Sequence, residues 1–374
     1  MPDQWDVPPH LLTNTMLIDM IIKLLCNEIF FKSAERTSKM YNLIFSASVI
    51  LILAILLFAG LKQDKNGEKA IILQRFNNIR GFFALEIIIG HVIRYDKSIL
   101  YPLGKFMIIS VAFFFFVSAF GLSYSFRTKD NYLKGFIKKK CCYLMLLIVV
   151  AYCLNVFISL FVPVNTGYYA GIQSIIPLLF SKTNWYLWAL LFFYFLFYII
   201  FRFTQKHRWL YFFLIVSVLT ALLFKAGWPE GWYASSFAFP FGLFYEEYYE
   251  KCNDFLYSKK GYGLTLLLVC LGLSSQLLDT NSLVGMVYLR NIMCIAGLLI
   301  LIYVLHIFEI NNRGMRILTK YSTELYLFQF IYLRISEATP WDYKLRMIFV
   351  ITLTAVTAFF MYRVINKARA CMHT

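Results

Sequence analysis

The sequence consists largely of long apolar segments separated by short polar stretches. A helix needs about 20 apolar residues to cross the hydrocarbon core of a bilayer. Only 15% of the 374 residues are charged and 60% are hydrophobic, whereas about a quarter of a soluble domain is charged. The sequence therefore predicts an all-α polytopic membrane protein with about eleven transmembrane helices, near residues 43–61, 79–94, 104–126, 141–162, 185–201, 209–225, 232–248, 261–278, 283–308, 318–336 and 345–363.

The N-terminal region differs from these spans. Asp19, Lys23 and Glu28 interrupt the apolar residues of segment 11–31, a pattern typical of an interfacial amphipathic helix rather than a full crossing. We therefore expect residues 1–42 to form an amphipathic N-terminal extension, followed by a span at 43–61. Residues 366–374 are expected to form a cytoplasmic tail.

Basic residues indicate the orientation of the chain. With segment 62–80 inside, the inner segments hold 23 Lys and Arg residues and the outer segments hold 7. Positive charge accumulates in cytoplasmic loops, so we expect a multi-pass plasma membrane protein with a cytoplasmic C-terminus. The net charge of +16 is then explained by topology and anionic membrane lipid. No nucleic-acid partner is expected, because no soluble basic domain is present to bind one.

No metal site is predicted. The eight cysteines include no Cys-x-x-Cys pair, and no zinc-ligand spacing is visible. Most of them lie in apolar segments, where cysteine acts as a small hydrophobic residue.

The segment IRGFFALEIIIGHVIRY, residues 79–95, places ionisable side chains inside an apolar helix. A charge at the centre of a bilayer costs about 2.5–3.5 kcal/mol, so such residues generally face a protein interior or an aqueous cavity. Arg80 and His91 are eleven residues apart, which places them on one helix face about 16 Å apart along the axis. His91 could be a structural histidine that donates to a carbonyl, or a general base whose ordinary pKa suits proton abstraction near neutral pH.

A lysine-rich stretch, FRTKDNYLKGFIKKKCC, follows the third apolar span. Lys138, Lys139 and Lys140 could simply anchor the loop on the cytoplasmic side. Alternatively, together with Arg80, they could dock a phosphate-rich ligand such as a nucleotide or coenzyme A.

Other ionisable residues also lie within apolar segments. Glu86 lies about 140° around the helix from His91, so we expect it to pair with Arg290 or with another helix. Glu324 is a further carboxylate within a span, and His306, near the end of segment 283–308, is expected at the membrane interface.

Four ordered segments resemble the membrane acyltransferase-3 family. They are IRGFFALEIIIGH with its Arg80 and His91, the Phe-rich FFFFVSAFGL, the basic loop followed by a span, and the pair NWYLWALLFFYF and YSTELYLFQF. Together they cover roughly residues 75–365, which we assign as a membrane acyltransferase domain. The resemblance implies a ten-helix core, to which the span at 43–61 is an N-terminal addition.

The resemblance also implies an activity. An acyl group, usually acetyl, would pass from acyl-CoA on the cytoplasmic side to a hydroxyl of a surface glycan, a lipid-linked sugar or a related acceptor. His91 would be the catalytic base, and Arg80 would lie at the end of the site that faces CoA. Acetyl-CoA or another acyl-CoA would be the donor substrate.

The chain departs from the family pattern at three places. Lys138–Lys140 stand where the family often has a pair of arginines, and lysine lacks the bidentate fork that arginine offers to phosphate. Ala119 replaces a glycine that follows Ser118, and Gln329 replaces a late histidine. These changes bear on donor contacts more than on the fold.

Two other classes of function fit a polytopic chain with charged residues in its spans. One is a transporter or flippase of a lipid-linked sugar, which needs no catalytic base. The other is a membrane scaffold or sensor whose polar groups only fix helix register. The sequence does not specify the acceptor or the oligomeric state, although Tyr168, Tyr169 and Trp185 could stack on a sugar ring.

Overall fold

The computed structural model describes residues 40–64, 66–94, 99–159, 185–274 and 282–371. The expected amphipathic segment 11–31 and the whole of the outer loop 163–184 therefore lie outside the described residues. The chain divides into two compact units, residues 1–52 and 53–374. The first described helix begins at Met40 and ends at Phe58, so its sequence crosses the boundary between the units. The elements from β1 to the C-terminus belong to the second unit.

Within the described residues, seven helices are long and apolar enough to cross a membrane: Met40–Phe58, Lys69–Ile93, Tyr101–Thr128, Trp185–Phe203, Arg208–Lys225, Val284–Ile307 and Tyr343–Lys367. Each coincides with one of the eleven expected spans. The expected span at 232–248 is instead a 3-10 turn and a ten-residue helix, Ala238–Glu247. The helices at the other three expected spans are Cys142–Ser159, Lys259–Ser274 and Ser322–Glu337. The structure thus confirms a largely helical membrane architecture, with fewer full-length spans in the described residues than expected.

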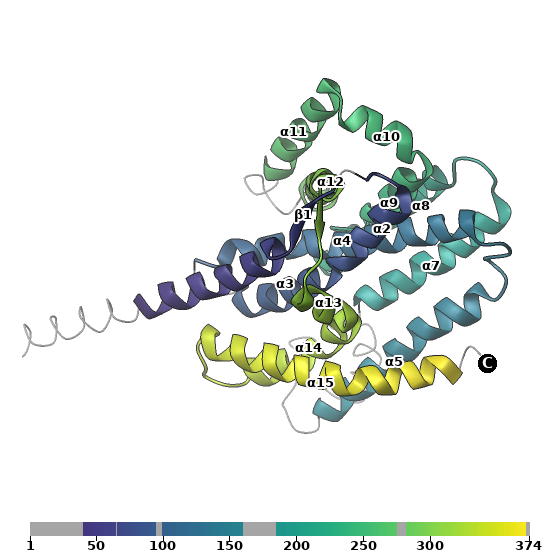
Figure 1. The fold of residues 1–374 in the computed structure, drawn as a ribbon. Coiled ribbons are helices and arrows are strands. Elements are labelled where there is room, and N and C mark those ends of the chain that lie inside the picture. Colours follow the sequence, from purple (N-terminus) through teal and green to yellow (C-terminus); the bar gives the residue numbers. More distant parts are fainter. Residues whose placement is uncertain (1–39, 65, 95–98, 160–184, 275–281, 372–374) are drawn as a thin grey trace, which may run out of the picture. The chain divides into compact units, whose positions relative to one another are not determined.

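The second unit contains a series of helices and two short strands (Figure 1). In chain order they are β1 (Leu61–Gln63), α2 (Lys69–Asn78), α3 (Arg80–Ile93), α4 (Tyr101–Thr128), η1 (Ile137–Cys141), α5 (Cys142–Ser159), α7 (Trp185–Phe203), α8 (Arg208–Lys225), η3 (Glu230–Trp232), α9 (Ala238–Glu247), α10 (Tyr249–Leu256), α11 (Lys259–Ser274), η4 (Val284–Leu289), α12 (Arg290–Ile307), β2 (Phe308–Ile310), α13 (Arg313–Lys320), α14 (Ser322–Glu337) and α15 (Tyr343–Cys371).

The helices that carry the predicted site form the core of this unit. α3 packs against α4, α13, α14 and α15, and Figure 1 shows α14 and α15 side by side. α4 begins with a proline in its first turn, where the missing N–H would have no helical partner in any case. Its Phe-rich middle, Phe113–Phe116, is buried on all sides, as expected for a helix surrounded by protein.

A two-stranded antiparallel ribbon adds a small β element to the all-α fold expected from the sequence. β1 pairs with β2 in the register Leu61 to Ile310, Lys62 to Glu309 and Gln63 to Phe308. Strands of three residues leave too short an alternating pattern to be read from sequence. The ribbon brings the chain before α2 next to the chain after α12, and both were expected on the same side of the membrane.

A buried carboxylate joins three more of the segments expected on that side. Glu246, at the end of α9, has no exposed surface. It accepts hydrogen bonds from Ser123 Oγ, from Arg127 Nε at 2.9 Å and from Lys69 Nζ at 3.2 Å. We call these four residues the Glu246 cluster. A buried charge is tolerable only when it is paired and hydrogen-bonded, so the cluster fixes the ends of α2, α4 and α9 against one another.

Gly81 allows α3 to approach α13 closely, next to Arg80. A Cβ atom on Gly81 would lie 2.3 Å from the backbone nitrogen of Thr319, and the Gly81 N–H donates to Thr319 Oγ1 at 3.1 Å. We expect Gly81→Ala to lower the free energy of unfolding by about 1–3 kcal/mol, because the two backbones must separate. Thermal unfolding of the purified protein in detergent measures this effect.

Gly263→Ala is the matched control for this variant, because nothing lies within 4 Å of the added Cβ in α11. It should leave stability unchanged or slightly raised, since alanine favours helix more than glycine. Equal unfolding temperatures for Gly81→Ala and Gly263→Ala would contradict the close approach.

Candidate active site

Arg80 and His91 lie at opposite ends of a single continuous helix, α3. α2 ends at Ile79, whose φ of −95° and ψ of 2° interrupt the helix, and α3 runs unbroken from Arg80 to Ile93. With 1.5 Å per residue and 3.6 residues per turn, the two side chains leave the same face about 16 Å apart. This spacing agrees with the sequence prediction.

Arg80 is half-buried and lies against aromatic side chains rather than acidic ones. Its guanidinium carbon is 5.9 Å from the centroid of the Phe114 ring. Tyr186 and Tyr194 of α7 lie near it. Among the described residues, no carboxylate lies within ion-pair distance of Arg80. An unpaired cation in such a setting favours an anionic ligand.

His91 is half-buried near the other end of α3. Its ring packs edge-on against Phe330 of α14, with 5.1 Å between the ring centroids. No hydrogen bond to a ring nitrogen of His91 occurs within the described part of the chain, and Arg94 acts on it electrostatically. The imidazole nitrogens therefore remain available to a substrate hydroxyl, which a structural histidine bonded to a carbonyl would not offer.

Small residues bring α4 close to α3 beside His91. A Cβ on Gly90 would lie 3.1 Å from the Cβ of Met107, and one on Gly104 would lie 3.3 Å from the Gly90 carbonyl oxygen. Close approach through small residues is the usual way in which membrane helices pack. The backbone on either side of His91 is thus fixed against α4.

A continuous series of aromatic rings connects His91 to Arg80. From the Phe330 ring beside His91, successive centroids are separated by 6.0 Å, 4.9 Å and 6.3 Å. The rings belong to α14, α7 and α4, and we call them the aromatic wall: Phe330, Tyr326, Tyr186 and Phe114. The planes of each consecutive pair of rings cross at 85°, 61° and 67°. This is close to the edge-to-face geometry that aromatic pairs prefer.

The wall residues lie in the sequence segments on which the resemblance to the family rests, but their contacts join residues that are far apart in the sequence. Tyr186 lies in NWYLWALLFFYF, and Tyr326 and Phe330 lie in YSTELYLFQF. Gln329, which replaces the family's late histidine, is fully buried, and its amide nitrogen donates to the Tyr326 carbonyl. It therefore fixes the backbone behind the wall.

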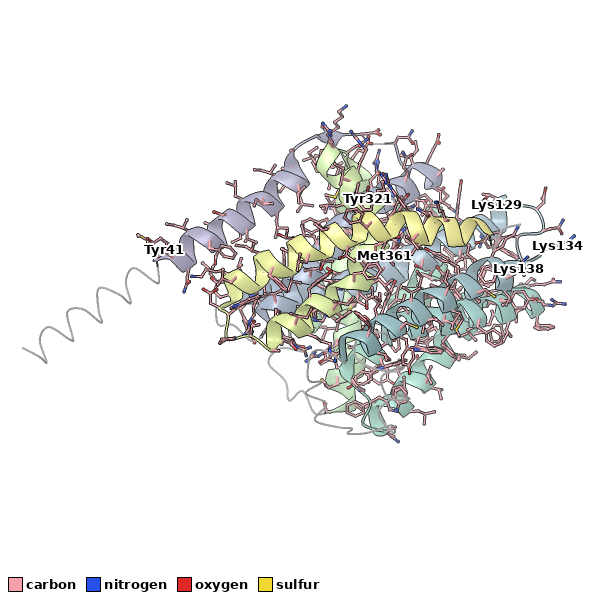
Figure 2. All side chains as sticks on the ribbon, turned by 90° about the horizontal axis from the view of Figure 1, so that it is seen from below. Tyr41, Lys129, Lys134, Lys138, Tyr321 and Met361 are labelled. Atoms are coloured by element: carbon pink, nitrogen blue, oxygen red, sulfur yellow. The ribbon has the colours of Figure 1, made fainter. Side chains whose placement is uncertain are left out.

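Lys138 and Lys139 are exposed and Lys140 is half-buried. All three belong to η1, which packs on α5 and α7. Lys129, Lys134 and Lys138 lie near one another at one end of the unit (Figure 2). Tyr194 of α7 packs against Phe136, next to η1, with 6.2 Å between the ring centroids.

The remaining polar residues have mainly structural partners. Glu86 accepts a hydrogen bond from Ser110 of α4 at 2.5 Å, and Arg290 pairs with Glu230. The suggested Glu86–Arg290 pair is therefore wrong, whereas pairing of Glu86 with another helix is confirmed. Glu324 is buried in the first turn of α14, where the helix dipole favours a negative charge. His306 is buried and lines a cavity.

One comparison with known proteins gives a match. A protein family described as an acyltransferase domain matches residues 73–364, which is more than half of the chain. No curated protein and no solved structure matches the chain.

Proposed function

The chain belongs to the membrane acyltransferase-3 family, and we propose that it transfers an acyl group, acetyl in the simplest case, from cytoplasmic acyl-CoA to a hydroxyl. The acceptor would be a surface glycan, a lipid-linked sugar or a related molecule at the plasma membrane. The aromatic wall supports this proposal most directly, because it joins an unpaired cation to an unbonded imidazole about 16 Å away. A donor with anionic phosphates at one end and a thioester at the other matches this arrangement.

The proposed chemistry needs one base and one cation. His91 takes the proton from the acceptor hydroxyl as its oxygen attacks the thioester carbonyl. The C–S bond breaks as the C–O bond forms, and the imidazolium returns the proton to the leaving thiolate. A positioned base of this kind contributes about 10²–10⁴-fold to rate. Arg80 binds the anionic part of the donor through charge-assisted hydrogen bonds.

The orientation of the donor follows from the basic end of the chain. Arg80, the lysines of η1, and Lys69 and Arg127 of the Glu246 cluster belong to segments expected in the cytoplasm, where acyl-CoA is available. Acceptor selection would depend on the opposite side, chiefly on loops 163–184 and 337–343. Membrane lipid would surround the bundle under this proposal.

Transfer of radiolabel tests the proposal. Purified protein in proteoliposomes should move label from acetyl-CoA to an acceptor extract, and surface glycans of cells lacking the protein should lose acyl groups by mass spectrometry. The transporter alternative predicts that a lipid-linked sugar crosses the liposome membrane without acyl-CoA. Flux of that kind, with no label transfer, would overturn the acyltransferase proposal.

The lysines of η1 provide a further prediction. We expect replacement of Lys138, Lys139 and Lys140 by alanine to raise KM for acyl-CoA severalfold while kcat is retained. Exposed charges attract the phosphates before chemistry begins, and the effect should shrink as ionic strength rises, because salt screens them. Steady-state kinetics at two salt concentrations measures it.

The matched control replaces the same three lysines by arginine. This variant keeps the positive charge in the loop, both for donor attraction and for topology, so its KM should remain close to that of the unmodified protein. Unchanged KM in the alanine variant would assign these lysines to membrane anchoring alone.

A further inference from the structure

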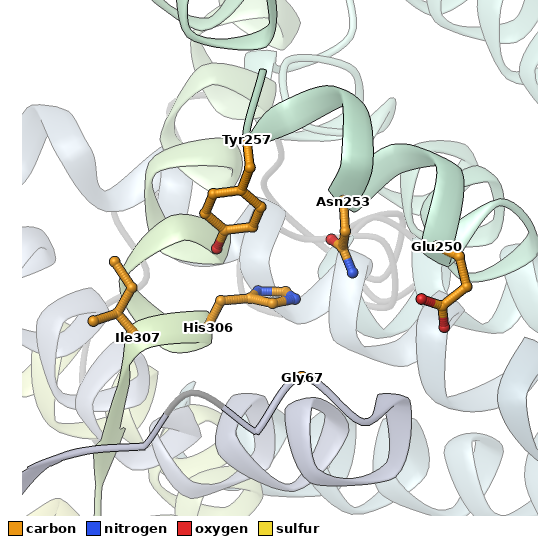
Figure 3. A pocket seen from close by; sticks show the side chains of 6 residues that line it. All are labelled: Gly67, Glu250, Asn253, Tyr257, His306 and Ile307. Atoms are coloured by element: carbon orange, nitrogen blue, oxygen red, sulfur yellow. The ribbon is translucent and has the colours of Figure 1, made fainter. Parts of the chain in front are cut away.

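A cavity separate from the aromatic wall lies where α10 and the end of α12 meet the chain before α2. Its volume is about 410 Å³, and it is lined by Gly67, Glu250, Asn253, Tyr257, His306 and Ile307 (Figure 3). Sites for small molecules typically enclose about 300–1,000 Å³ and combine flat apolar surfaces with a few convergent polar groups. This cavity has both features, and nothing in the proposed transfer step uses them.

Buried hydrogen bonds hold one side of the cavity rigid. The Tyr249 hydroxyl donates to the Gly67 carbonyl at 2.7 Å and lies 3.1 Å from His306 Nε2. His306 Nδ1 lies 2.9 Å from the Ile302 carbonyl oxygen, so that nitrogen carries a hydrogen. Tyr249 and His306 are 2% and 8% exposed. The imidazole and the Gly67 backbone are therefore fixed before any ligand arrives.

The other side of the cavity presents one hydrogen-bond acceptor and one donor. Asn253 Oδ1 accepts from the Tyr245 hydroxyl at 2.7 Å, which leaves the amide nitrogen as a donor. The Glu250 carboxylate accepts hydrogen bonds only. The two residues are three positions apart on α10 and so share a face, and both side chains point toward the space above Gly67 (Figure 3).

The lining excludes an anion as the group that enters the cavity. Its six residues include no Lys or Arg, and the one carboxylate would repel phosphate. The Tyr257 ring, 6.0 Å from His306, offers a flat surface on which a planar ring can stack. The preferred occupant is thus a flat ring with a hydrogen-bond acceptor next to an amino donor.

The edge of adenine has this pattern, because its N7 accepts a hydrogen bond and its N6 amino group donates. Guanine presents two acceptors, N7 and O6, on the same edge, and one of them would face Glu250. We propose that this cavity binds the adenine ring of a nucleotide-bearing ligand, with Asn253 donating to the ring and Glu250 accepting from its amino group.

Two ligands could supply the adenine ring. The first is the acyl-CoA donor, and this assignment rests on the proposed function. The second is a free adenine nucleotide. The path of α2 favours the donor, because the helix begins at Lys69, two residues from Gly67, and leads to Arg80 about 16 Å away. A long ligand held by its base in the cavity would therefore extend along α2 toward Arg80.

The test is calorimetric titration of the full-length protein in nanodiscs with AMP, GMP and CoA. AMP is expected to bind and GMP is not. Glu250→Ala should weaken AMP binding by about tenfold or more, since a paired contact to a base edge discriminates strongly. Asp254→Ala is the matched control, because it removes the same charge from an exposed neighbouring position on α10 and should leave AMP binding unchanged.

Each outcome decides one question. Equal binding of AMP and GMP, or unchanged AMP binding in Glu250→Ala, overturns the adenine site. If CoA displaces AMP, and Glu250→Ala raises KM for acyl-CoA, the donor is the occupant. If AMP binds but CoA does not compete, the site stands and belongs to a free nucleotide. AMP binding without any acyl transfer would leave this site intact and refute the proposed function alone.

Discussion

Replacing His91 by glutamine is expected to lower the rate of acyl transfer by about 10²–10⁴-fold, the usual contribution of a positioned general base. Glutamine has a similar length and can retain the packing against Phe330, which lies 5.1 Å from the imidazole. It cannot take a proton from the acceptor hydroxyl near neutral pH. Single-turnover transfer of label from acetyl-CoA measures the loss directly, without interference from product release.

The same variant distinguishes catalysis from folding. His91→Gln should unfold at the same temperature as the unmodified protein and should still bind CoA, because the base acts on the acceptor and not on the phosphates. A full transfer rate in this variant would remove His91 from the mechanism. A loss of rate accompanied by an equal loss of thermal stability would assign it a structural role beside Gly90 and Met107.

Replacing Arg80 has the second large expected effect, and it falls on donor binding. Arg80→Ala should raise KM for acyl-CoA by about tenfold to a hundredfold, since hydrogen bonds to charged groups are worth about 1.5–3 kcal/mol. Arg80→Lys should give an intermediate value, because lysine keeps the charge but not the bidentate fork. Steady-state kinetics and direct CoA titration should agree on the order of the three proteins.

Stability gives a second readout for Arg80. Within the described residues Arg80 has no carboxylate partner, and burying an unpaired charge costs free energy. Removing the charge should therefore not destabilise the fold. Arg202→Ala is a suitable control, because within the described part of the chain that exposed arginine interacts with Tyr198 and Phe203 of its own helix. Unchanged donor affinity in Arg80→Ala, with affinity equal to that of the control, would contradict the assignment.

The helical features of the site follow from local sequence. A continuous helix from Arg80 to Ile93 makes the eleven-residue spacing a shared face, and the apolar character of the segment predicts its burial. The family assignment likewise rests on ordered local motifs, and the match over residues 73–364 confirms it. These properties need no knowledge of which helices are neighbours.

The aromatic wall and the cavity that we propose to bind adenine are formed by residues that are distant in the sequence, and the sequence does not specify which of them become neighbours. Phe114 and Tyr326 are more than two hundred residues apart, yet the ring of Tyr186 lies between them. Tyrosine and phenylalanine are common in this chain, with 26 and 38 copies, so no single ring is distinctive before packing is known. His306 was expected at the membrane interface from its place near the end of a span. Its burial depends on the contact with Tyr249, which joins α10 to α12 and is not visible in the sequence.

At one expected span the composition of the segment indicates a crossing, but the helix that forms is too short for one. Residues 232–248 are apolar enough to suggest a crossing, but buried Ser235 and Ser236 precede a helix of only ten residues. Gly242 then allows α9 to approach α4 so closely that an added Cβ would lie 2.6 Å from the Phe116 carbonyl oxygen. A short helix enclosed by protein needs an apolar surface on every side without spanning a bilayer.

The central claim is that this protein moves an acyl group rather than carrying a molecule across the membrane. The most direct measurement supplies proteoliposomes with acetyl-CoA labelled in the acetyl group and follows label into a glycan or lipid-linked acceptor. We expect label to accumulate on the acceptor, free CoA to appear in equal amount, and His91→Gln to abolish both. Movement of the lipid-linked sugar in the absence of acetyl-CoA, with no label on any acceptor, would contradict it.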